Sequence, residues 1–325
     1  MLPKPYENVL AAIGNTPMVK LMHVSALVKA DIYAKLEFLN PGGSVKDRIA
    51  KYMVEKAERL GAITPGATIV ENSSGNTAIG LAMVARQKGY KAKIIMRDST
   101  SREKIEIVRT MGAEVVLVDA TLPPENPRSY NNIAPAVARE TAGAFFPDQH
   151  NNLDNNETHY MTTGPEIWQQ MDGRIDYFIT GIGTGGTVCG AGRYLKEQDP
   201  RIQVIAIDPL GSIFHDYYKT GQRVTPKRYL IEGLGDEFLI KCAQLDMLDD
   251  IIQVTDKIAF TWTRKLARME GLITGGSSGA NVWGALQLAQ RIDRPARIVT
   301  LLPDSGYRYL STIYNDIWLK QKGFI

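Results

Sequence analysis

Short, almost continuously apolar segments alternate with helical segments along most of this 325-residue chain, and this alternation limits the possible folds. In the first half we predict strands at 18–24, 31–36, 67–71, 91–96 and 114–118, and helices at 47–60, 78–89 and 101–111. In the second half we predict strands at 175–180, 202–207 and 296–302, and helices at 188–198, 255–270 and 278–292. Strands that are apolar on both faces and are joined by helices indicate parallel sheets covered on both sides. The sequence therefore predicts an α/β fold with doubly wound parallel sheets.

A polar run at residues 150–156 separates two such groups of strands and helices. We therefore expect two α/β sub-domains, at 1–150 and 151–325, with residues 13–34 packing on the second. In open parallel sheets, ligands bind at the carboxyl ends of the strands. We expect a ligand in the cleft between the two sub-domains, next to the glycine-rich loops.

Composition argues against several classes of function. The net charge is only +3 and charged residues make up 22% of the chain, which argues against a dedicated nucleic-acid surface. The two cysteines, Cys189 and Cys242, predict a reducing compartment without disulfides, and the four scattered histidines have no zinc-binding spacing. No apolar run has the pattern of a membrane span or a signal peptide. We expect a cytoplasmic protein with no metal, nucleic-acid or membrane partner.

A Pro-Gly-Gly turn at 41–43 leads into a helix whose first turn carries Lys46. We predict Ser44 as the N-cap of this helix and Gly61 as its end. A lysine at this end is unusual because the helix dipole is positive there. The same field favours the neutral amine, which is the form that attacks a carbonyl group. The alternative interpretation is a surface lysine beside Asp47, and this stretch alone does not decide between the two.

Two strand–loop–helix segments place backbone N–H groups at a helix start, which is where anions bind. The loop Ser73–Thr77 is rich in hydroxyl and amide groups and suits a carboxylate. The loop Gly183–Thr187 is dense in glycine, so its backbone can approach a phosphate closely. No GxxxxGK[ST] motif is present, so a nucleoside-triphosphate P-loop is not predicted.

The second loop has other interpretations. Gly181, Gly183 and Gly186 fit the GxGxxG pattern, and Asp208 ends the next predicted strand, where a ribose-binding acid would lie. This spacing matches a dinucleotide-binding fingerprint and would make the protein an NAD-dependent oxidoreductase. The same glycines would also serve close packing of helix on strand. A non-catalytic ligand-sensing module is a third alternative.

Lys46 favours a carbonyl cofactor over NAD. A lysine at a helix start, a carboxylate loop and a phosphate loop are the parts needed to hold pyridoxal 5'-phosphate (PLP) as a Schiff base. Ser305 follows the last predicted strand, and its hydroxyl could face the pyridine nitrogen unless Leu302–Gly306 is only a turn. A neutral hydroxyl would not keep that nitrogen protonated, which would favour elimination over transamination.

Four motifs stand out in combination: Asn40–Arg48, Ser74–Thr77, Gly183–Thr187 and Leu302–Gly306. Together they resemble the fold-type II PLP-dependent enzymes, and within these the cystathionine β-synthase and cysteine synthase group. The likeness extends from Gly14 to the C-terminus. Five segments resemble cystathionine β-synthase more than cysteine synthase: 162–168, 190–197, 208–213, 232–235 and 321–325. The resemblance implies a homodimer of two-sub-domain chains, each with PLP in the cleft between its sub-domains.

The resemblance also implies a role for each matching residue. Lys46 would form the internal aldimine with PLP and act as the base for the α-proton. Asn76 would hydrogen-bond the pyridoxal O3' and Ser305 the ring nitrogen. The phosphate would be held by Gly183, Thr184, Gly185, Gly186 and Thr187. The amino-acid carboxylate would be bound by Ser73, Ser74, Gly75, Thr77 and Gln149, and the entrance for the second substrate would be lined by Gly233 and Gly235.

The implied reaction is β-replacement: L-serine or O-acetyl-L-serine loses its β-substituent to give an aminoacrylate, which a thiol then attacks. In the cystathionine β-synthase version the thiol is homocysteine, and the reaction belongs to transsulfuration and cysteine biosynthesis. A cysteine synthase using sulfide and a diaminopropionate-type synthase using an amine nucleophile remain alternatives.

The chain departs from the family pattern at two places. Residues 72–74 are Asn-Ser-Ser where the family usually has Pro-Thr-Ser, and His150 follows Gln149 where the family has tyrosine or phenylalanine. Tyrosine is typical of the cystathionine enzymes and phenylalanine of the cysteine synthases. His150 is expected to be a wall of the substrate pocket, or alternatively a group that binds a leaving group or an acidic nucleophile. The chain has no cysteine before Cys189 and ends at Ile325, so we expect neither haem nor activation by S-adenosylmethionine.

Overall fold

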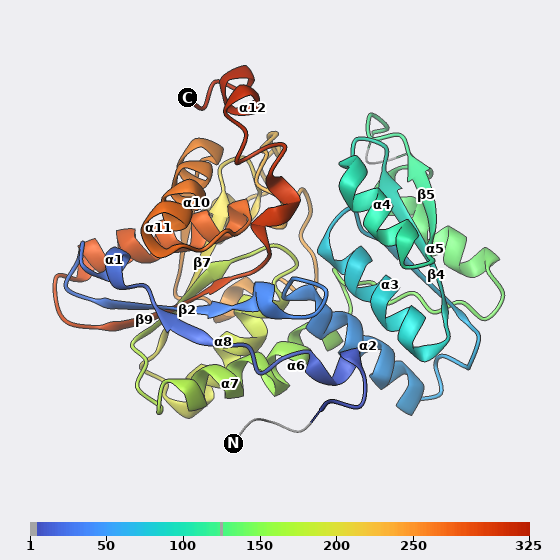
Figure 1. Ribbon diagram of the computed structural model, residues 1–325, viewed down its shortest axis with the longest axis horizontal. Helices are drawn as coiled ribbons and strands as arrows, with labels where there is room; N and C mark the ends of the chain where they lie inside the picture. Colours follow the sequence, from blue (N-terminus) through green and yellow to red (C-terminus); the bar gives the residue numbers. More distant parts are fainter. Residues whose placement is uncertain (1–4, 124–125) are drawn as a thin grey trace. The chain divides into compact units, whose positions relative to one another are not determined.

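The computed structural model describes residues 5–123 and 126–325 (Figure 1). The described chain forms two compact units. Unit 1 contains residues 5–13 and 40–154, and unit 2 contains residues 14–39 and 155–325. Each unit has its own sheet and its own hydrophobic core.

Unit 1 is built on a three-stranded parallel sheet in the order β3-β4-β5, formed by Thr68–Asn72, Lys91–Arg97 and Glu114–Val118. Its helices are η1 (Val9–Ala12), α2 (Lys46–Arg59), α3 (Asn76–Lys88), α4 (Arg102–Thr110) and α5 (Tyr130–Glu140). Ile69 and Ile94 of the sheet join the core formed with α3 and α4, whereas Val70 and Ile95 join the core formed with α5. Both faces of the sheet are therefore covered, as near-continuously apolar parallel strands require.

Unit 2 contains a six-stranded sheet in the order β1-β2-β9-β6-β7-β8, parallel except for the antiparallel pairing of β1 with β2. Its strands are β1 (Met18–Lys20), β2 (Asp31–Leu36), β6 (Tyr177–Gly181), β7 (Gln203–Pro209), β8 (Asp250–Val254) and β9 (Arg297–Leu302). Its α-helices are α1 (Met22–Ser25), α6 (Asp154–Met161), α7 (Thr163–Gln170), α8 (Gly186–Gln198), α9 (Phe214–Thr220), α10 (Asp256–Glu270), α11 (Gly276–Ile292) and α12 (Asp316–Gln321). Short 3-10 helices are η2 (Glu37–Leu39), η3 (Leu245–Met247) and η4 (Gly306–Tyr309).

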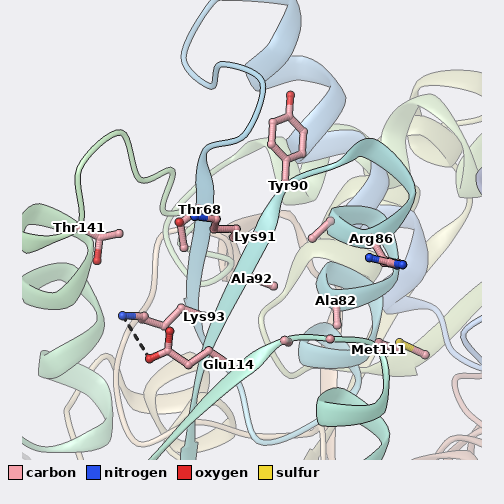
Figure 2. Close-up of a pocket in the computed structure, with 13 residues that line it drawn as sticks. Thr68, Ala82, Arg86, Tyr90, Lys91, Ala92, Lys93, Met111, Glu114 and Thr141 are labelled. Atoms are coloured by element: carbon pink, nitrogen blue, oxygen red, sulfur yellow. Dashed lines mark ion pairs between the residues drawn. The ribbon is translucent and has the colours of Figure 1, made fainter.

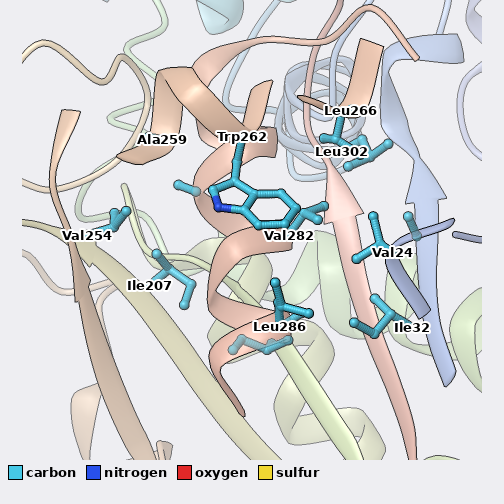
Figure 3. Close-up of a cluster of buried hydrophobic side chains, with 14 of the residues drawn as sticks. Val24, Ile32, Ile207, Val254, Ala259, Trp262, Leu266, Val282, Leu286 and Leu302 are labelled. Atoms are coloured by element: carbon cyan, nitrogen blue, oxygen red, sulfur yellow. The ribbon is translucent and has the colours of Figure 1, made fainter. Parts of the chain in front are cut away.

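The core of unit 2 lies where α10 and α11 pack on one face of this sheet (Figure 3). Trp262 of α10 belongs to the same buried cluster as Ile207 of β7. Helix α11 lies close to the sheet at Gly284, because a Cβ there would overlap the Ile207 side chain. Helix α8 covers the opposite face, where a Cβ on Gly192 would lie 2.7 Å from Val204. The α/β fold with parallel sheets is confirmed.

Two local predictions are corrected by the structure, and one strand was missed in the sequence. The strand predicted at 18–24 is wrong in its second half, because residues 22–25 form α1. The N–H groups of His23 and Val24 donate to the Glu270 carboxylate of α10, at 2.8 and 2.9 Å, and so stabilise the start of this helix. Strand β8 was not predicted. Ser44 is not the N-cap of α2, because Val45 precedes the helix and is itself in a helical conformation.

Helix α5 begins at Tyr130. Residues 124–125, which precede it in the chain, lie outside the described residues. Across 5–123 and 126–325, no helix combines the length and the apolar character needed to span a bilayer.

Candidate active site

Lys46 is the first residue of α2 and follows a turn that is fixed by its neighbour Asp47. The Asp47 side chain is fully buried, and its Oδ2 accepts a hydrogen bond from the Gly42 N–H at 2.6 Å. A Cβ on Gly42 would lie 2.5 Å from Asp47 Oδ1, so this position requires glycine. Ser44 Oγ accepts the Lys46 N–H at 3.2 Å. These contacts fix the backbone that carries the half-buried Lys46 side chain.

Helix α2 packs closely on α3 because position 80 is glycine. A Cβ on Gly80 would lie 3.0 Å from the Ala50 Cβ and 3.2 Å from the carbonyl oxygen of Lys46. Asn76 is four residues before Gly80 and shares its face of α3. The close approach therefore places the start of α2, with Lys46, beside the start of α3, with Asn76.

Gly80→Val is expected to lower the free energy of unfolding by about 2 kcal/mol, because the added side chain overpacks the contact between α2 and α3. Denaturant titration of the purified protein measures this loss. The matched control is Arg86→Val at an exposed position of the same helix, which carries only the helix-propensity cost of about 0.5 kcal/mol. Equal losses in the two variants would show that the packing of Gly80 is unimportant.

The loop between β3 and α3 is held by its own hydroxyl groups. Ser73 Oγ accepts the N–H of Gly75 at 3.3 Å and the N–H of Ala78 at 3.2 Å. Thr77 Oγ1 donates to Gln149 Oε1 at 2.6 Å, which joins the loop to a segment far along the chain. The first-turn N–H groups of α3 have no acceptor within the helix, so this end of α3 suits an anion. The predicted carboxylate-binding residues of this loop and Gln149 therefore do lie together.

The polar atoms of Ser74 are partly used by neighbouring elements. Its Oγ accepts the Arg97 N–H at 2.9 Å, and its own N–H donates to the Tyr130 hydroxyl at 3.0 Å. The Arg97 guanidinium lies over the Tyr130 ring, 4.5 Å from its centroid, and burial raises the pKa of Tyr130 to about 12. The Ser74 hydroxyl keeps its hydrogen, which it can donate to a ligand. Tyr130 was missed in the sequence because nothing local connects it to a loop 56 residues away.

Glu71, next to the end of β3, was also missed in the sequence. Its side chain is fully buried, and its two oxygens accept the N–H groups of Asn72, at 3.1 Å, and Gln149, at 3.3 Å. Burial, together with the negative charge of Asp148, raises the pKa of Glu71 to about 8. The carboxyl group therefore carries its proton at neutral pH.

The raised pKa of Glu71 predicts a folded state that becomes less stable as the pH rises from about 5 to about 8. In this window the folded protein keeps a proton that the unfolded chain has lost, so each pH unit lowers the free energy of unfolding by about 1 kcal/mol. Unfolding titrations across this range, on the wild type and on Glu71→Gln, measure the effect. Because glutamine does not titrate, the variant should have the flatter pH dependence, and equal slopes would contradict the prediction.

In unit 2, the loop Gly183–Thr187 joins β6 to α8 and carries glycine where no side chain fits. A Cβ on Gly183 would overlap the Gly233 carbonyl group. Gly185 directly precedes α8 with a left-handed φ of 86°, a conformation that glycine adopts without strain. The first-turn N–H groups of α8 have no acceptor within the helix and no side-chain cap. The start of α8 therefore fits a phosphate group.

Helix α6 braces this phosphate loop. Thr184 Oγ1 accepts a hydrogen bond from Asn155 Nδ2 at 2.9 Å, and Thr187 Oγ1 lies 3.2 Å from His159 Nε2. A Cβ on Gly186 would overlap the Asn155 side chain. Asn155 and His159 are four residues apart on one face of α6, and neither was predicted to support the loop.

Ser305 lies at the same edge of the sheet as the phosphate loop. It follows β9, which is the neighbour of β6, and parallel neighbours end at a common edge. Its Oγ accepts the Tyr307 N–H at 3.4 Å. The Gly235 N–H donates to the Ile182 carbonyl oxygen at 2.7 Å, which ties the Gly233–Gly235 segment to the phosphate loop. The predicted residues of unit 2 are thus brought together.

The NAD alternative is not supported at Asp208 and Gly181. Asp208 is fully buried, its Oδ2 accepts the His215 N–H at 3.0 Å, and burial raises its pKa to about 7. A carboxyl group enclosed in this way is not available to a ribose. A Cβ on Gly181 would overlap Leu234, so this glycine serves packing.

The candidate residues are divided between the two units. Unit 1 carries Lys46, Ser73, Ser74, Gly75, Asn76, Thr77, Gln149 and His150. Unit 2 carries Gly183, Thr184, Gly185, Gly186, Thr187, Gly233, Gly235 and Ser305. His150 is half-buried and directly follows Gln149 in the chain.

A cavity of about 490 Å³ in unit 1 lies away from these residues (Figure 2). Its lining includes Thr68, Lys91 and Glu114, the first residues of the three strands. Lys93 Nζ and Glu114 Oε1 form an ion pair of 3.2 Å there. The loop Ser73–Thr77 follows the carboxyl end of β3, so the cavity lies at the opposite end of this sheet.

A family model described as "pyridoxal-phosphate dependent enzyme" matches residues 9–304. The chain belongs to this family. The family resemblance stated from the sequence motifs, and the PLP cofactor that it implies, are thereby confirmed. The two glycine- and hydroxyl-rich helix starts and Lys46 offer the anion-binding groups and the amine that this cofactor requires.

Named relatives of the family divide between two activities. The chain is 41% identical to cystathionine β-synthase of Apis mellifera, over 99% of this chain and 64% of that protein. It is also 41% identical to cystathionine β-synthase of Oryctolagus cuniculus, over 99% of this chain and 59% of that protein. The chain thus spans about three fifths of the length of these two relatives.

Two further relatives are matched over nearly their whole length. Cysteine synthase of Staphylococcus aureus is 44% identical, over 96% of this chain and 98% of that protein. The crystal structure of the O-acetylserine-dependent cystathionine β-synthase of Helicobacter pylori has a TM-score of 0.88 and 37% identity, and the match covers 96% of this chain and 100% of that one.

Proposed function

We propose that this chain catalyses PLP-dependent β-replacement, in which the β-substituent of L-serine or O-acetyl-L-serine is exchanged for a thiol. The observation that carries this proposal is the arrangement in unit 1. Lys46 begins a helix that packs on α3, and α3 begins with a loop of hydroxyl and amide groups joined to Gln149. The similarity to cysteine synthase over nearly the whole of both chains supports the same reaction class.

The residues proposed to hold PLP come from both units. The phosphate would be bound by the N–H groups of Gly183–Thr187, the ring nitrogen by the Ser305 hydroxyl and O3' by Asn76. The Lys46 amine would form the covalent link. When bound, PLP supplies an electron sink that stabilises negative charge at the amino-acid Cα.

The remaining tasks follow from the chemistry of the side chains. Lys46 Nζ, once free, would take the proton from the amino-acid Cα as a general base. The hydroxyl groups of Ser73 and Ser74 and the amide NH₂ of Gln149 would donate hydrogen bonds to the α-carboxylate, while the Thr77 hydroxyl would hold the Gln149 amide in place. A neutral hydroxyl at Ser305 would not keep the ring nitrogen of bound PLP protonated, and the weaker electron sink would favour loss of the β-substituent over transamination.

We propose homocysteine as the second substrate, with cystathionine as the product. The relatives named cystathionine β-synthase align with 99% of this chain, and the solved structure of similar fold carries the same name. In this reaction the C–O bond at Cβ of the amino acid breaks and a C–S bond to the thiol forms. The thiol proton ends up on the leaving group, which departs as water from serine or as acetic acid from O-acetylserine. The alternative second substrates are sulfide, which the cysteine synthase relative favours, and an amine.

We also propose that the protein is a cytoplasmic homodimer, as the family resemblance implies. Cys189 and Cys242 are both buried free thiols, which suits a reducing compartment. Light scattering of the purified protein would measure its mass. A monomer at all protein concentrations would contradict the dimer.

Product analysis tests the proposed reaction. The PLP-loaded protein is incubated with serine or O-acetylserine, each combined with homocysteine, sulfide or an amino-acid amine, and the products are identified by mass spectrometry. Cystathionine is expected from homocysteine. If no combination gives a β-substituted product, β-replacement is excluded. Repeating the assay with His150→Tyr and His150→Phe tests whether this position affects the choice of nucleophile.

A further inference from the structure

Glu71 joins two segments of unit 1 that both carry proposed substrate-binding residues. Its Oε1 accepts the N–H of Asn72, at the end of its own strand, and its Oε2 accepts the N–H of Gln149, 78 residues away. The backbone N–H of Asp148 also contributes to the environment of this carboxyl group. Glu71 is fully buried, so water does not replace these hydrogen bonds.

The segment that Glu71 reaches is a turn that needs support. Asp148 has a φ of 49°, in the left-handed region that residues other than glycine rarely adopt. The Asp148 carbonyl oxygen accepts the N–H groups of Asn151 and Asn152, at 3.0 and 2.9 Å. These contacts hold one side of the turn. Glu71 holds the other side, where the chain continues into Gln149.

The same turn carries a proposed carboxylate ligand into the substrate loop. Gln149 is 5% exposed, and its Oε1 accepts the Thr77 hydroxyl at 2.6 Å. With its oxygen used in this way, the Gln149 side chain presents its NH₂ group, which only donates, to a ligand. A hydrogen-bonded path therefore leads from Glu71 through Gln149 to Thr77 at the start of α3.

We propose that Glu71 is a positioning residue for the amino-acid substrate: it fixes the Asp148–Gln149 turn so that the Gln149 amide meets the α-carboxylate. This inference rests on the proposed function. Glu71 itself does not touch the substrate in this account, because its side chain is enclosed by the strand end and the turn.

The chemistry of the contact requires a carboxyl group and not merely a polar side chain of this size. Both Glu71 oxygens accept N–H groups, and a protonated carboxyl group still has lone pairs on both oxygens, whereas glutamine can accept with only one atom and would turn its NH₂ against the other N–H. The titratable groups whose charge acts on Glu71 are Asp148 and Tyr130. The Asp148 carboxylate already accepts Asn151 Nδ2, and the Tyr130 hydroxyl already accepts the Ser74 N–H. Glu71→Gln therefore removes one hydrogen bond with almost no change in volume.

The experiment is a double-mutant cycle on the PLP-loaded protein. Wild type, Glu71→Gln, Gln149→Ala and the double variant are titrated with L-serine by calorimetry, and hydrogen exchange of residues 148–152 is followed by mass spectrometry. The control is Glu106→Gln, an exposed glutamate of α4. We expect Glu71→Gln to raise the Kd for serine about ten-fold and to speed exchange in the turn, with the PLP absorbance unchanged. The double variant should bind serine no more weakly than Gln149→Ala alone, because Glu71 acts through Gln149.

Three results would overturn the proposal: an unchanged Kd in Glu71→Gln, additive losses in the double variant, or wild-type protein that does not bind serine. The first of these results, if it came with faster exchange in the turn, would assign Glu71 a purely structural role. If Glu71→Gln does not fold, Glu71→Asp, which keeps both acceptors but is shorter, is measured by the same criteria. Because calorimetry and exchange need no turnover, a failure here is distinct from a failure of β-replacement in the product assay.

Discussion

Lys46→Ala is expected to keep the fold and to lose turnover by about three orders of magnitude or more. The proposed reaction needs one amine both to link the cofactor and to move the α-proton, and Lys46 begins the helix that packs beside Asn76. Alanine has the highest helix propensity, so α2 should remain intact. Borohydride reduction of the wild type, followed by digestion and mass spectrometry, should place the PLP adduct on Lys46.

The matched control for this variant is Lys51→Ala on the same helix. Lys51 Nζ donates to the Leu10 carbonyl oxygen at 3.0 Å and has no part in the proposed chemistry. We expect the control to retain wild-type turnover and the adduct on Lys46. An adduct on another lysine, or wild-type rates in Lys46→Ala, would refute the assignment of Lys46 as the catalytic amine.

Elements whose determinants are local could be predicted from the sequence. The strand–loop–helix segments around β3 and β6 have apolar strands, turn residues and amphipathic helices in direct succession. Gly61 ends α2 with a φ of 68°, as glycine after a helix usually does. Helices α3 and α8 begin two residues earlier than predicted, at Asn76 and Gly186, since the preceding glycine already completes the turn.

Elements that depend on distant partners could not be predicted in this way. Residues 22–25 have an apolar pattern that suits a strand, but the Glu270 carboxylate, 247 residues away, accepts the first N–H groups of a helix there. Strand β8 contains only a short apolar core between acidic residues, and its pairing with β7 makes it a strand. Tertiary contacts decided both cases.

The same distinction applies to the candidate site. Lys46 and the Gly183–Thr187 loop belong to motifs that can be recognised from neighbouring residues. Glu71 and Tyr130 support the substrate loop through hydrogen bonds that span 78 and 56 residues, so no local pattern marks them. Asp208 is the opposite case, a residue that a local pattern marks but the fold does not use in that way. Its spacing in the sequence fits a ribose-binding acid, but its carboxyl group is buried and so is not available to a ribose.

Gly183→Ala is expected to weaken PLP binding about a hundred-fold, because a Cβ at this position would overlap the Gly233 carbonyl group. Both groups belong to the backbone, so no side-chain rotation relieves the overlap, and either the phosphate loop or the Gly233–Gly235 segment must move. A shift of a few tenths of an ångström is enough to misalign N–H groups that must all point at one phosphate. Fluorescence titration of the apoprotein with PLP measures the change in Kd.

The control for Gly183→Ala must lose stability without disturbing the phosphate loop. Gly221, at the end of α9, has a φ of 69°, and a Cβ there would have no atom of the described residues within 4 Å. Gly221→Ala therefore brings backbone strain of about 1 kcal/mol and no overlap. If the two variants unfold at similar denaturant concentrations but only Gly183→Ala binds PLP weakly, the effect lies in the loop. Wild-type PLP affinity in Gly183→Ala would show that the cofactor's phosphate is held elsewhere, and the proposed role of the start of α8 would have to be abandoned.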